Sequence, residues 1–222
     1  MKAIAINGSP RKNWNTATLL QHALAGAQEE GAETELVNLY DLQFTGCVSC
    51  FACKKIGGKH YGRCAAIDEL SPVLQAIESA DVLLLGTPVY FGSESGEVRS
   101  FIERLLFPFF TYTSDYQCIF PGRLQTAMIY TMNIPEDMIP ILQYEQLLSR
   151  IRGYMEHAFG NCELQICTDT LQFSDYSKYL CTRWDADAKA RRRAEVFPQD
   201  CAKAKALGAA LVERARAAVA SQ

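Results

Sequence analysis

The sequence has 222 residues, of which 49% are hydrophobic and 21% charged, and its formal net charge is −3. This composition is typical of a chain with a packed core and argues against a disordered protein. It also argues against nucleic acid as the main partner, because phosphate backbones are bound by a concentrated basic face. The one dense basic run, Arg191–Arg193, predicts a solvated helix face.

Apolar runs alternate with helical patterns along the chain. The runs predict strands at Lys2–Asn7, Thr34–Leu39, Asp81–Thr87, Leu124–Met132 and Cys162–Leu171. The helical spacing of apolar residues predicts helices at Thr16–Glu30, Asp68–Ser79, Gly96–Leu106, Met138–Phe159 and Asp200–Ala220. This alternation predicts a single α/β domain over residues 1–222, a three-layer sandwich with a five-stranded parallel sheet in the doubly wound order 2-1-3-4-5. A cysteine-rich loop, residues 45–66, is inserted after the second strand.

The loop after the first strand is rich in hydrogen-bond donors. Its candidate phosphate ligands are Ser9, Arg11, Asn13, Asn15 and Thr16, and the predicted helix starts directly behind them. A helix N-terminus offers free N–H groups and a favourable dipole to an anion. The loop has neither a Walker sequence nor G-x-G-x-x-G, so a nicotinamide-binding Rossmann site is not indicated. The alternative is an ordinary polar turn with a helix cap.

The loop after the third strand has the composition of a ring-binding loop. Tyr90 and Phe91 provide an aromatic wall, and Gly92 lets the backbone approach a ligand closely. The alternative is that both rings merely pack at a strand end. In the order 2-1-3-4-5, the first and third strands end at the crevice where such sheets bind ligands. The two loops together therefore predict a flavin mononucleotide (FMN) site, with Thr131, Met132 and Asn133 next along the same edge.

These motifs resemble a known family. GSPRKNWNTATLL, the cysteine cluster, and TPVYFGSESGEVRSFIERL are similar to the NADPH-dependent FMN reductase and iron-sulfur flavoprotein group of flavodoxin-like proteins, and LQFSDYSKY and FPQDC extend the likeness. The resemblance implies bound FMN, reduction by a nicotinamide nucleotide, and a homo-oligomer. By motif match, the polar residues of the first loop hold the phosphate. The ring is cradled by Pro88, Val89, Tyr90, Phe91 and Gly92.

The predicted function is an FMN-dependent NAD(P)H oxidoreductase that passes electrons to a quinone, a flavin, an iron-sulfur centre or another small-molecule or protein acceptor. No catalytic acid or base is predicted, because positioning and electrostatics carry a hydride transfer. One alternative is a non-enzymatic flavodoxin-type electron carrier. Another is a redox sensor based on thiols or a cluster.

Cys47, Cys50 and Cys53 are spaced C-x2-C-x2-C, and Cys64 follows after a longer gap. This set has three interpretations: a [4Fe–4S] cluster, a zinc site with His60 as a spare ligand, or free and redox-active thiols. The resembled flavoproteins have a shorter gap before the fourth cysteine. A cluster placed after the second strand is expected on the same edge as the flavin, where it would exchange electrons with it.

The run after Met1 and Lys2 is too short for the apolar region of a secretion signal, and no apolar stretch approaches bilayer length. We therefore expect a cytoplasmic location and no membrane contact. The aromatic segment Phe107–Phe120 predicts a dimer contact that also walls a substrate pocket.

Overall fold

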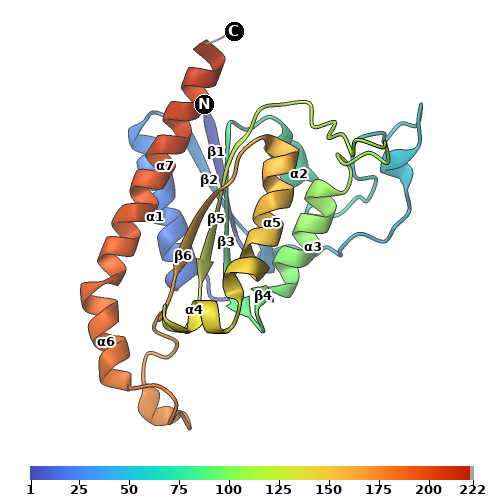
Figure 1. Cartoon of the computed structure of the whole chain (residues 1–222). Helices are drawn as coiled ribbons and strands as arrows, with labels where there is room; N and C mark the ends of the chain where they lie inside the picture. Colours follow the sequence, from blue (N-terminus) through green and yellow to red (C-terminus); the bar gives the residue numbers. More distant parts are fainter. Residues whose placement is uncertain (221–222) are drawn as a thin grey trace.

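A parallel sheet forms the centre of the computed structural model, which describes residues 1–220 (Figure 1). Its strands are β1 (Lys2–Asn7), β2 (Glu33–Asn38), β3 (Val82–Tyr90), β5 (Gln125–Thr131) and β6 (Glu163–Cys167), in the order β2-β1-β3-β5-β6. Counted along the chain, these parallel strands have the predicted order 2-1-3-4-5. The sequence pattern did not show β4 (Ser93–Glu94), which pairs antiparallel with the end of β3.

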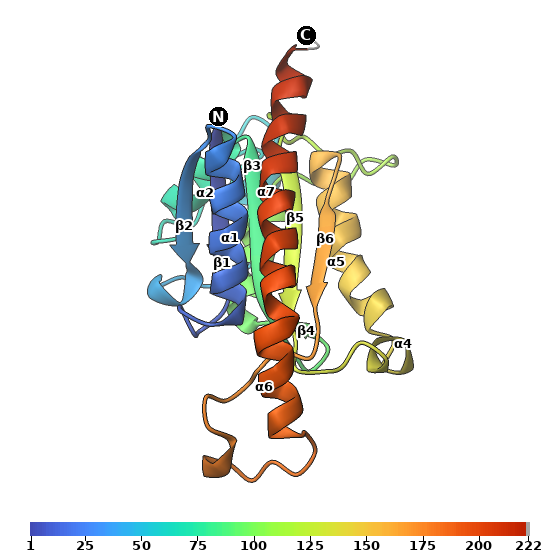
Figure 2. The same ribbon diagram turned by 90° about the vertical axis from the view of Figure 1, so that its left-hand side faces the viewer.

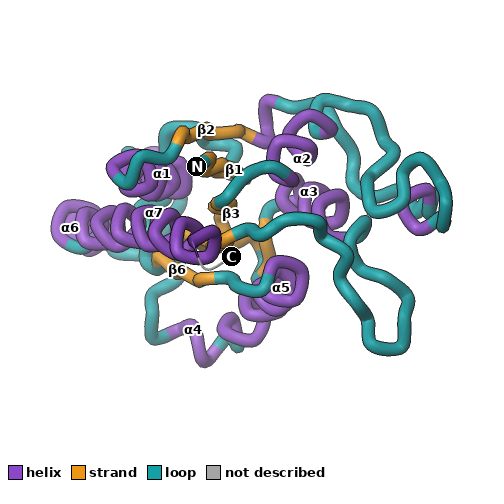
Figure 3. The backbone as a smooth tube through the Cα atoms, turned by 90° about the horizontal axis from the view of Figure 1, so that it is seen from above, coloured by secondary structure: helices purple, strands orange, loops and turns teal. Residues whose placement is uncertain are grey.

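Helices cover both faces of this sheet, as the flavodoxin-like fold requires. Figure 2 shows α1 (Asn15–Glu29) and α7 (Phe197–Ala220) side by side on one face. Figure 3 shows α2 (Ser71–Glu78), α3 (Gly96–Leu106) and α5 (Tyr144–Phe159) on the other. The shorter helices are α4 (Met138–Ile141), α6 (Ala186–Glu195), η1 (Leu39–Asp41), η2 (Ala52–Lys54) and η3 (Tyr176–Lys178). None of the described helices is long and apolar enough to cross a membrane.

The alternation of side chains along β1 divides the core between the two faces. Ile4 and Ile6 pack with the α2, α3 and α5 layer, whereas Ala3 and Ala5 pack with the α1 and α7 layer. Glycines let α1 and α7 come close together. A Cβ on Gly26 would lie 1.9 Å from the carbonyl oxygen of Lys205, and a Cβ on Gly208 would lie 1.8 Å from that of Ala23.

Two helix predictions need correction. The predicted helix Met138–Phe159 is broken into α4 and α5, because Gln143 adopts a left-handed conformation with φ of 56°. The basic run Arg191–Arg193 lies on α6, but it is not simply a solvated face. Arg192 donates to Asp200 Oδ2 (2.7 Å), and Arg193 donates to Asn15 Oδ1 (2.8 Å).

The aromatic segment Phe107–Phe120 packs largely within its own chain. Phe109 is buried and meets Phe120 edge-on, with ring centroids 4.9 Å apart. Phe110 is buried too and stacks on Tyr116 and His157. These two rings are thus covered by their own chain, whereas Tyr112 is 71% exposed, and the dimer contact of the segment stays a prediction.

Candidate functional site

The carboxyl ends of β1, β3 and β5 place three loops around one pocket. Among its lining residues are nine that the sequence predicted: Ser9, Arg11, Asn15, Thr16, Pro88, Val89, Tyr90, Met132 and Asn133. Three predicted residues, Asn13, Phe91 and Gly92, do not line it. Thr131, predicted together with Met132 and Asn133, lines the pocket too, and so do four residues that sequence reasoning missed as ligands: Trp14, Thr170, Leu171 and Gln172. The last three follow β6. They lie at the pocket because β6 pairs with β5 and its carboxyl end therefore lies at the same edge of the sheet.

The loop after β1 leaves the first turn of α1 free to bind an anion. Gly8 permits the tight entry, since a Cβ there would lie 1.9 Å from Val98 Cγ2. Ser95 Oγ donates to the Gly8 carbonyl oxygen (2.7 Å) and fixes the loop against α3. Trp14, at the capping position, makes no side-chain capping hydrogen bond. The backbone N–H groups of Asn15, Thr16 and Ala17 have no acceptor among the described residues, as an anion site requires.

The segment after β6 closes over this loop. Arg11 donates to the carbonyl oxygen of Gln172 (2.6 Å), while Trp14 Nε1 and Asn15 Nδ2 donate to that of Leu171 (3.0 and 2.9 Å). The side-chain oxygen of Asn15, Oδ1, accepts in turn from Arg193 of α6. The orientation of Asn15 is thereby set, with its amide N–H₂ group directed toward the segment that lines the pocket.

The loop after β3 is a strained hairpin. Val89 pairs with Glu94 and Tyr90 with Ser93, so Phe91 and Gly92 form a two-residue turn. Both have positive φ, 52° for Phe91 and 78° for Gly92, as a type I′ turn requires. Glycine accepts this conformation readily, but phenylalanine does not. The Phe91 side chain is fully exposed, so no packing in this chain compensates for the strain.

A buried carboxylate anchors the hairpin to the core. Glu94 is 5% exposed and accepts hydrogen bonds from Tyr130 Oη (2.6 Å) and Ser93 Oγ (2.9 Å). Burial raises the pKa of Tyr130 well above its usual range, and the neighbouring Glu94 adds to this shift. Tyr130 therefore stays a neutral hydrogen-bond donor to Glu94. Through Glu94 it fixes the hairpin that carries Tyr90, one of the residues that line the pocket.

Asn133 lines the pocket and carries a buried polar atom without a partner in the described part of the chain. Its Oδ1 is buried and accepts no hydrogen bond from the described residues. Its Nδ2 donates to the Gln172 side chain, and its carbonyl oxygen accepts from the buried Lys189 Nζ (2.6 Å). Asn133 is thus fixed in place with one acceptor unsatisfied, and such an orphan atom is commonly a sign of a missing ligand or water.

The cysteine-rich loop does not lie on this edge, which corrects the sequence-based expectation. It packs instead against the C-terminal end of α3, where Cys47 N–H donates to Glu103 Oε2 (3.1 Å). Lys54 Nζ donates to the carbonyl oxygens of Phe107 and Phe110 just beyond that helix. The buried Arg104 donates to Thr45 O (3.0 Å), Cys64 Sγ (2.9 Å) and Asp68 Oδ2 (2.8 Å).

Cys47, Cys50, Cys53 and Cys64 line one small pocket of about 40 Å³. However, within residues 1–220 no three Cys, His, Asp or Glu side chains are grouped as the ligands of a metal ion would be. Burial raises the pKa of the Cys53 thiol. As arranged, the four thiols are neighbours around a cavity and do not form a preformed cluster site.

Comparisons with known proteins agree with this architecture. The chain is 39% identical over 104 residues to an iron-sulfur flavoprotein of Methanocaldococcus jannaschii, an alignment covering 47% of this chain and 51% of that protein. An iron-sulfur flavoprotein of Archaeoglobus fulgidus is 38% identical over 104 residues, covering 47% and 48%. The chain thus spans about half the length of the curated relatives it matches.

Solved structures extend the likeness of the fold over most of the chain. An NAD(P)H:quinone oxidoreductase from Methanothermobacter marburgensis superposes with a TM-score of 0.70 at 11% identity, covering 94% of this chain and 98% of that one. An FMN-dependent NADH-azoreductase from Bacillus anthracis, solved with FMN, gives 0.65 at 13% identity, covering 96% and 100%. A family model described as NADPH-dependent FMN reductase matches residues 1–117. Because this match takes in more than half of the 222 residues, the chain belongs to the NADPH-dependent FMN reductase family.

Proposed function

We propose that this chain is an FMN-dependent NAD(P)H oxidoreductase. The observation that carries the proposal is the convergence, in one crevice, of the uncapped N-terminus of α1, Arg11 and the hairpin after β3. When bound, FMN supplies the redox chemistry: it takes up electrons from a nicotinamide donor and passes them to a quinone, a flavin or another acceptor. Family membership and the flavodoxin-like fold support this proposal.

The residues present suit a phosphate. The free N–H groups of Asn15, Thr16 and Ala17 would hold its oxygens at the positive end of the α1 dipole. Arg11 would add a charge-assisted hydrogen bond. Ser9 lines the same pocket, and its Oγ accepts from the Arg11 N–H (3.2 Å), which shapes the loop. Asn13 belongs to the loop but lies outside the lining, and we keep it as a proposed ligand on its motif position alone.

The opposite part of the pocket suits a flat ring with polar edges. Pro88, Val89 and Tyr90 would form one wall, and Met132 and Asn133 would meet the far edge. The unsatisfied Asn133 Oδ1 lacks a donor, and the imide N–H of an isoalloxazine is a donor of the kind it lacks. Phe91 and Gly92 would cover the ring from the hairpin tip. The chain's own contribution is binding and orientation, and no side-chain proton donor is needed.

A second candidate function adds one-electron transfer through a [4Fe–4S] cluster. Two observations favour it: the relatives are named iron-sulfur flavoproteins, and the four cysteines line one pocket. Their present arrangement does not fit a cluster, so we derive no step through one. We propose a nicotinamide nucleotide and a small-molecule or protein acceptor as partners, and a homo-oligomer as the assembly.

The test is to purify the protein without oxygen, record its visible spectrum, and count flavin and iron. We expect a flavin spectrum and, in stopped-flow mixing, rapid bleaching by NADPH or NADH. Slow bleaching by both nucleotides would instead identify an electron carrier. About four irons per chain would establish the cluster. A colourless protein that also fails to bind added FMN would refute the proposal.

A further inference from the structure

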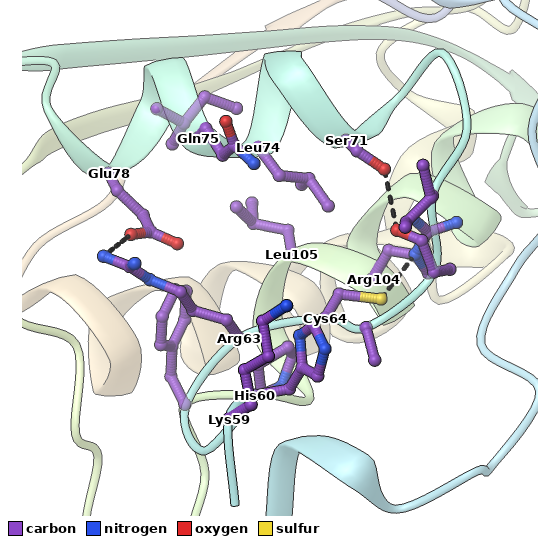
Figure 4. Close-up of a pocket in the computed structure, with 16 residues that line it drawn as sticks. Lys59, His60, Arg63, Cys64, Ser71, Leu74, Gln75, Glu78, Arg104 and Leu105 are labelled. Atoms are coloured by element: carbon purple, nitrogen blue, oxygen red, sulfur yellow. Dashed lines mark hydrogen bonds and ion pairs between the residues drawn. The ribbon is translucent and has the colours of Figure 1, made fainter.

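A third cavity lies between α2 and the cysteine-rich loop, with α3 at its base (Figure 4), and it shares Cys64 and Arg104 with the small cysteine-lined pocket. Its volume is about 420 Å³, which is in the range of pockets that hold small molecules. It shares no lining residue with the pocket at the carboxyl ends of β1, β3 and β5. The FMN proposal therefore leaves this cavity unexplained.

The walls of this cavity differ in chemistry. Leu74, Ile77, Leu105 and Phe109, from α2, α3 and the segment after α3, make an apolar surface. The cysteine-rich loop contributes Lys59, His60 and Arg63, and Figure 4 shows Lys59 and His60 together on that wall, across from α2. The cavity therefore offers an apolar surface to the body of a ligand and a positive, donor-rich wall to its head.

Two of these polar side chains are available to a ligand. Arg63 is already paired with Glu78 across the cavity (2.8 Å). By contrast, the side chains of Lys59 and His60 make no hydrogen bond or ion pair with any of residues 1–220. Lys59 is exposed and His60 is partly buried, so a ligand can reach both side chains at the open side of the cavity, next to its apolar surface.

The sequence of the loop independently favours an anion. Residues 47–67 contain Lys54, Lys55, Lys59 and Arg63 but no Asp or Glu, in a chain with a net charge of −3. Lys54 is held by backbone carbonyl groups, and Arg63 by Glu78. Lys55 does not line the cavity. Lys59 is therefore the cation of this loop that lines the cavity without an acidic or carbonyl partner among the described residues.

The cavity is also held open by fixed walls. Ser71 Oγ donates to the Ala66 carbonyl oxygen (2.7 Å), which ties the loop to the start of α2. Arg104, only 2% exposed, ties the loop to α3 through Cys64 and Thr45. A site that is already assembled loses less entropy when it binds a ligand.

We propose that this cavity binds a small organic anion, with an aromatic or aliphatic body against Leu74 and Leu105 and one carboxylate or phosphate head group at Lys59 and His60. The shared chemistry of the ligand is a single anionic head on an apolar body. This site is separate from the proposed FMN site, so it stands or falls independently of the oxidoreductase function.

Isothermal titration calorimetry of the purified full chain tests the site with 2-naphthoate and 2-naphthyl phosphate as probes. We expect saturable binding of one probe per chain, with the tighter probe identifying the preferred head group. The double variant Lys59→Gln/His60→Gln should weaken binding by about tenfold or more, as for lost charge-assisted hydrogen bonds. Neutral 2-naphthol and inorganic phosphate alone should each bind more weakly than the probes.

Lys55→Gln is the matched control, because Lys55 lies on the same loop and does not line the cavity. It should leave the affinity within about twofold. Gln75→Trp should abolish binding by filling the cavity from α2, without a change of charge. Equal losses in the control and the double variant would overturn the proposal, as would undiminished binding in Gln75→Trp or 2-naphthol binding as tightly as 2-naphthoate.

Discussion

Helix α3 separates two regions of the molecule that are held in place in different ways. At its N-terminal end, the loop after β1 and the hairpin after β3 extend from the sheet, and the parallel pairing of those strands sets their positions. At its C-terminal end, the cysteine-rich loop belongs to no strand and is anchored by a few side chains, chiefly Lys54 and Arg104. The first region should therefore resist single substitutions in its loops, whereas the second should depend on its anchors.

The largest effect should follow Arg104→Met. This side chain is 1% exposed, and its loss would remove the ion-pair partner of Asp68 and the donor to the Thr45 carbonyl, while Asp68 would keep its hydrogen bonds from Leu70 N–H and Ser71 Oγ. We expect the free energy of unfolding, measured with urea, to fall by about 3–5 kcal/mol. Arg214→Met is the control, because its exposed pair with Glu163 should contribute under about 1 kcal/mol. Equal losses in the two variants would show that Arg104 is not the anchor of the loop.

The next effect should appear at the other end of α3, in ligand binding. Arg11→Gln should raise the Kd for FMN about tenfold, because one charge-assisted hydrogen bond to the phosphate is lost. The Kd for riboflavin, which has no phosphate, should stay within about twofold. Both are measured by quenching of flavin fluorescence.

Lys12→Gln controls for general charge in that experiment, since the neighbouring Lys12 pairs with Asp41 and does not line the pocket. A riboflavin affinity that falls in parallel with that for FMN would place Arg11 away from the phosphate. An equal effect of Lys12→Gln would show that only the net charge matters.

The same contrast explains what the sequence could predict. The order of the parallel strands and most of the crevice follow from alternating patterns and from the rule that ligands bind where strand order reverses. Thr170, Leu171 and Gln172 were missed because Thr170 lies in no motif and the motif LQFSDYSKY, which starts at Leu171, carried a family likeness without a ligand role. All three reach the pocket only through the pairing of β6 with β5. The cysteine-rich loop was misplaced for a different reason: a long loop can leave the edge on which it starts, and its anchors are single side chains without a periodic pattern.

A smaller effect should come from the strained hairpin tip. In Phe91→Gly, the left-handed turn loses its steric penalty, and no packing is lost because the ring is fully exposed. Phe91→Ala removes the same ring but retains a Cβ. We expect the glycine variant to be more stable than the alanine variant by about 1 kcal/mol in urea unfolding. Equal stabilities would mean that the turn relaxes at no cost.

The smallest effect we expect is a pH dependence at the cysteine-rich loop. The hydrogen bond from Arg104 holds the pKa of Asp68 below its ordinary value of 3.8. The pKa of Asp68 is therefore lower in the folded state than in the unfolded state. The charged carboxylate stabilises the fold fully at pH values above the ordinary pKa of 3.8, and this stabilisation is lost as the pH falls through the folded-state pKa. Asp68→Asn lacks this titration while keeping a polar partner for Arg104.

The unfolding midpoints of the two proteins in urea should therefore differ at neutral pH, with the wild type the more stable. The difference should shrink as the pH falls below about 4, because a protonated Asp68 then resembles the asparagine. Arg11 and its loop lie at the far end of α3, so Arg11→Gln should follow the wild-type pH profile throughout. A gap between wild type and Asp68→Asn that stays constant with pH would show that hydrogen bonding alone, without the charge of the carboxylate, holds Arg104 and the loop in place.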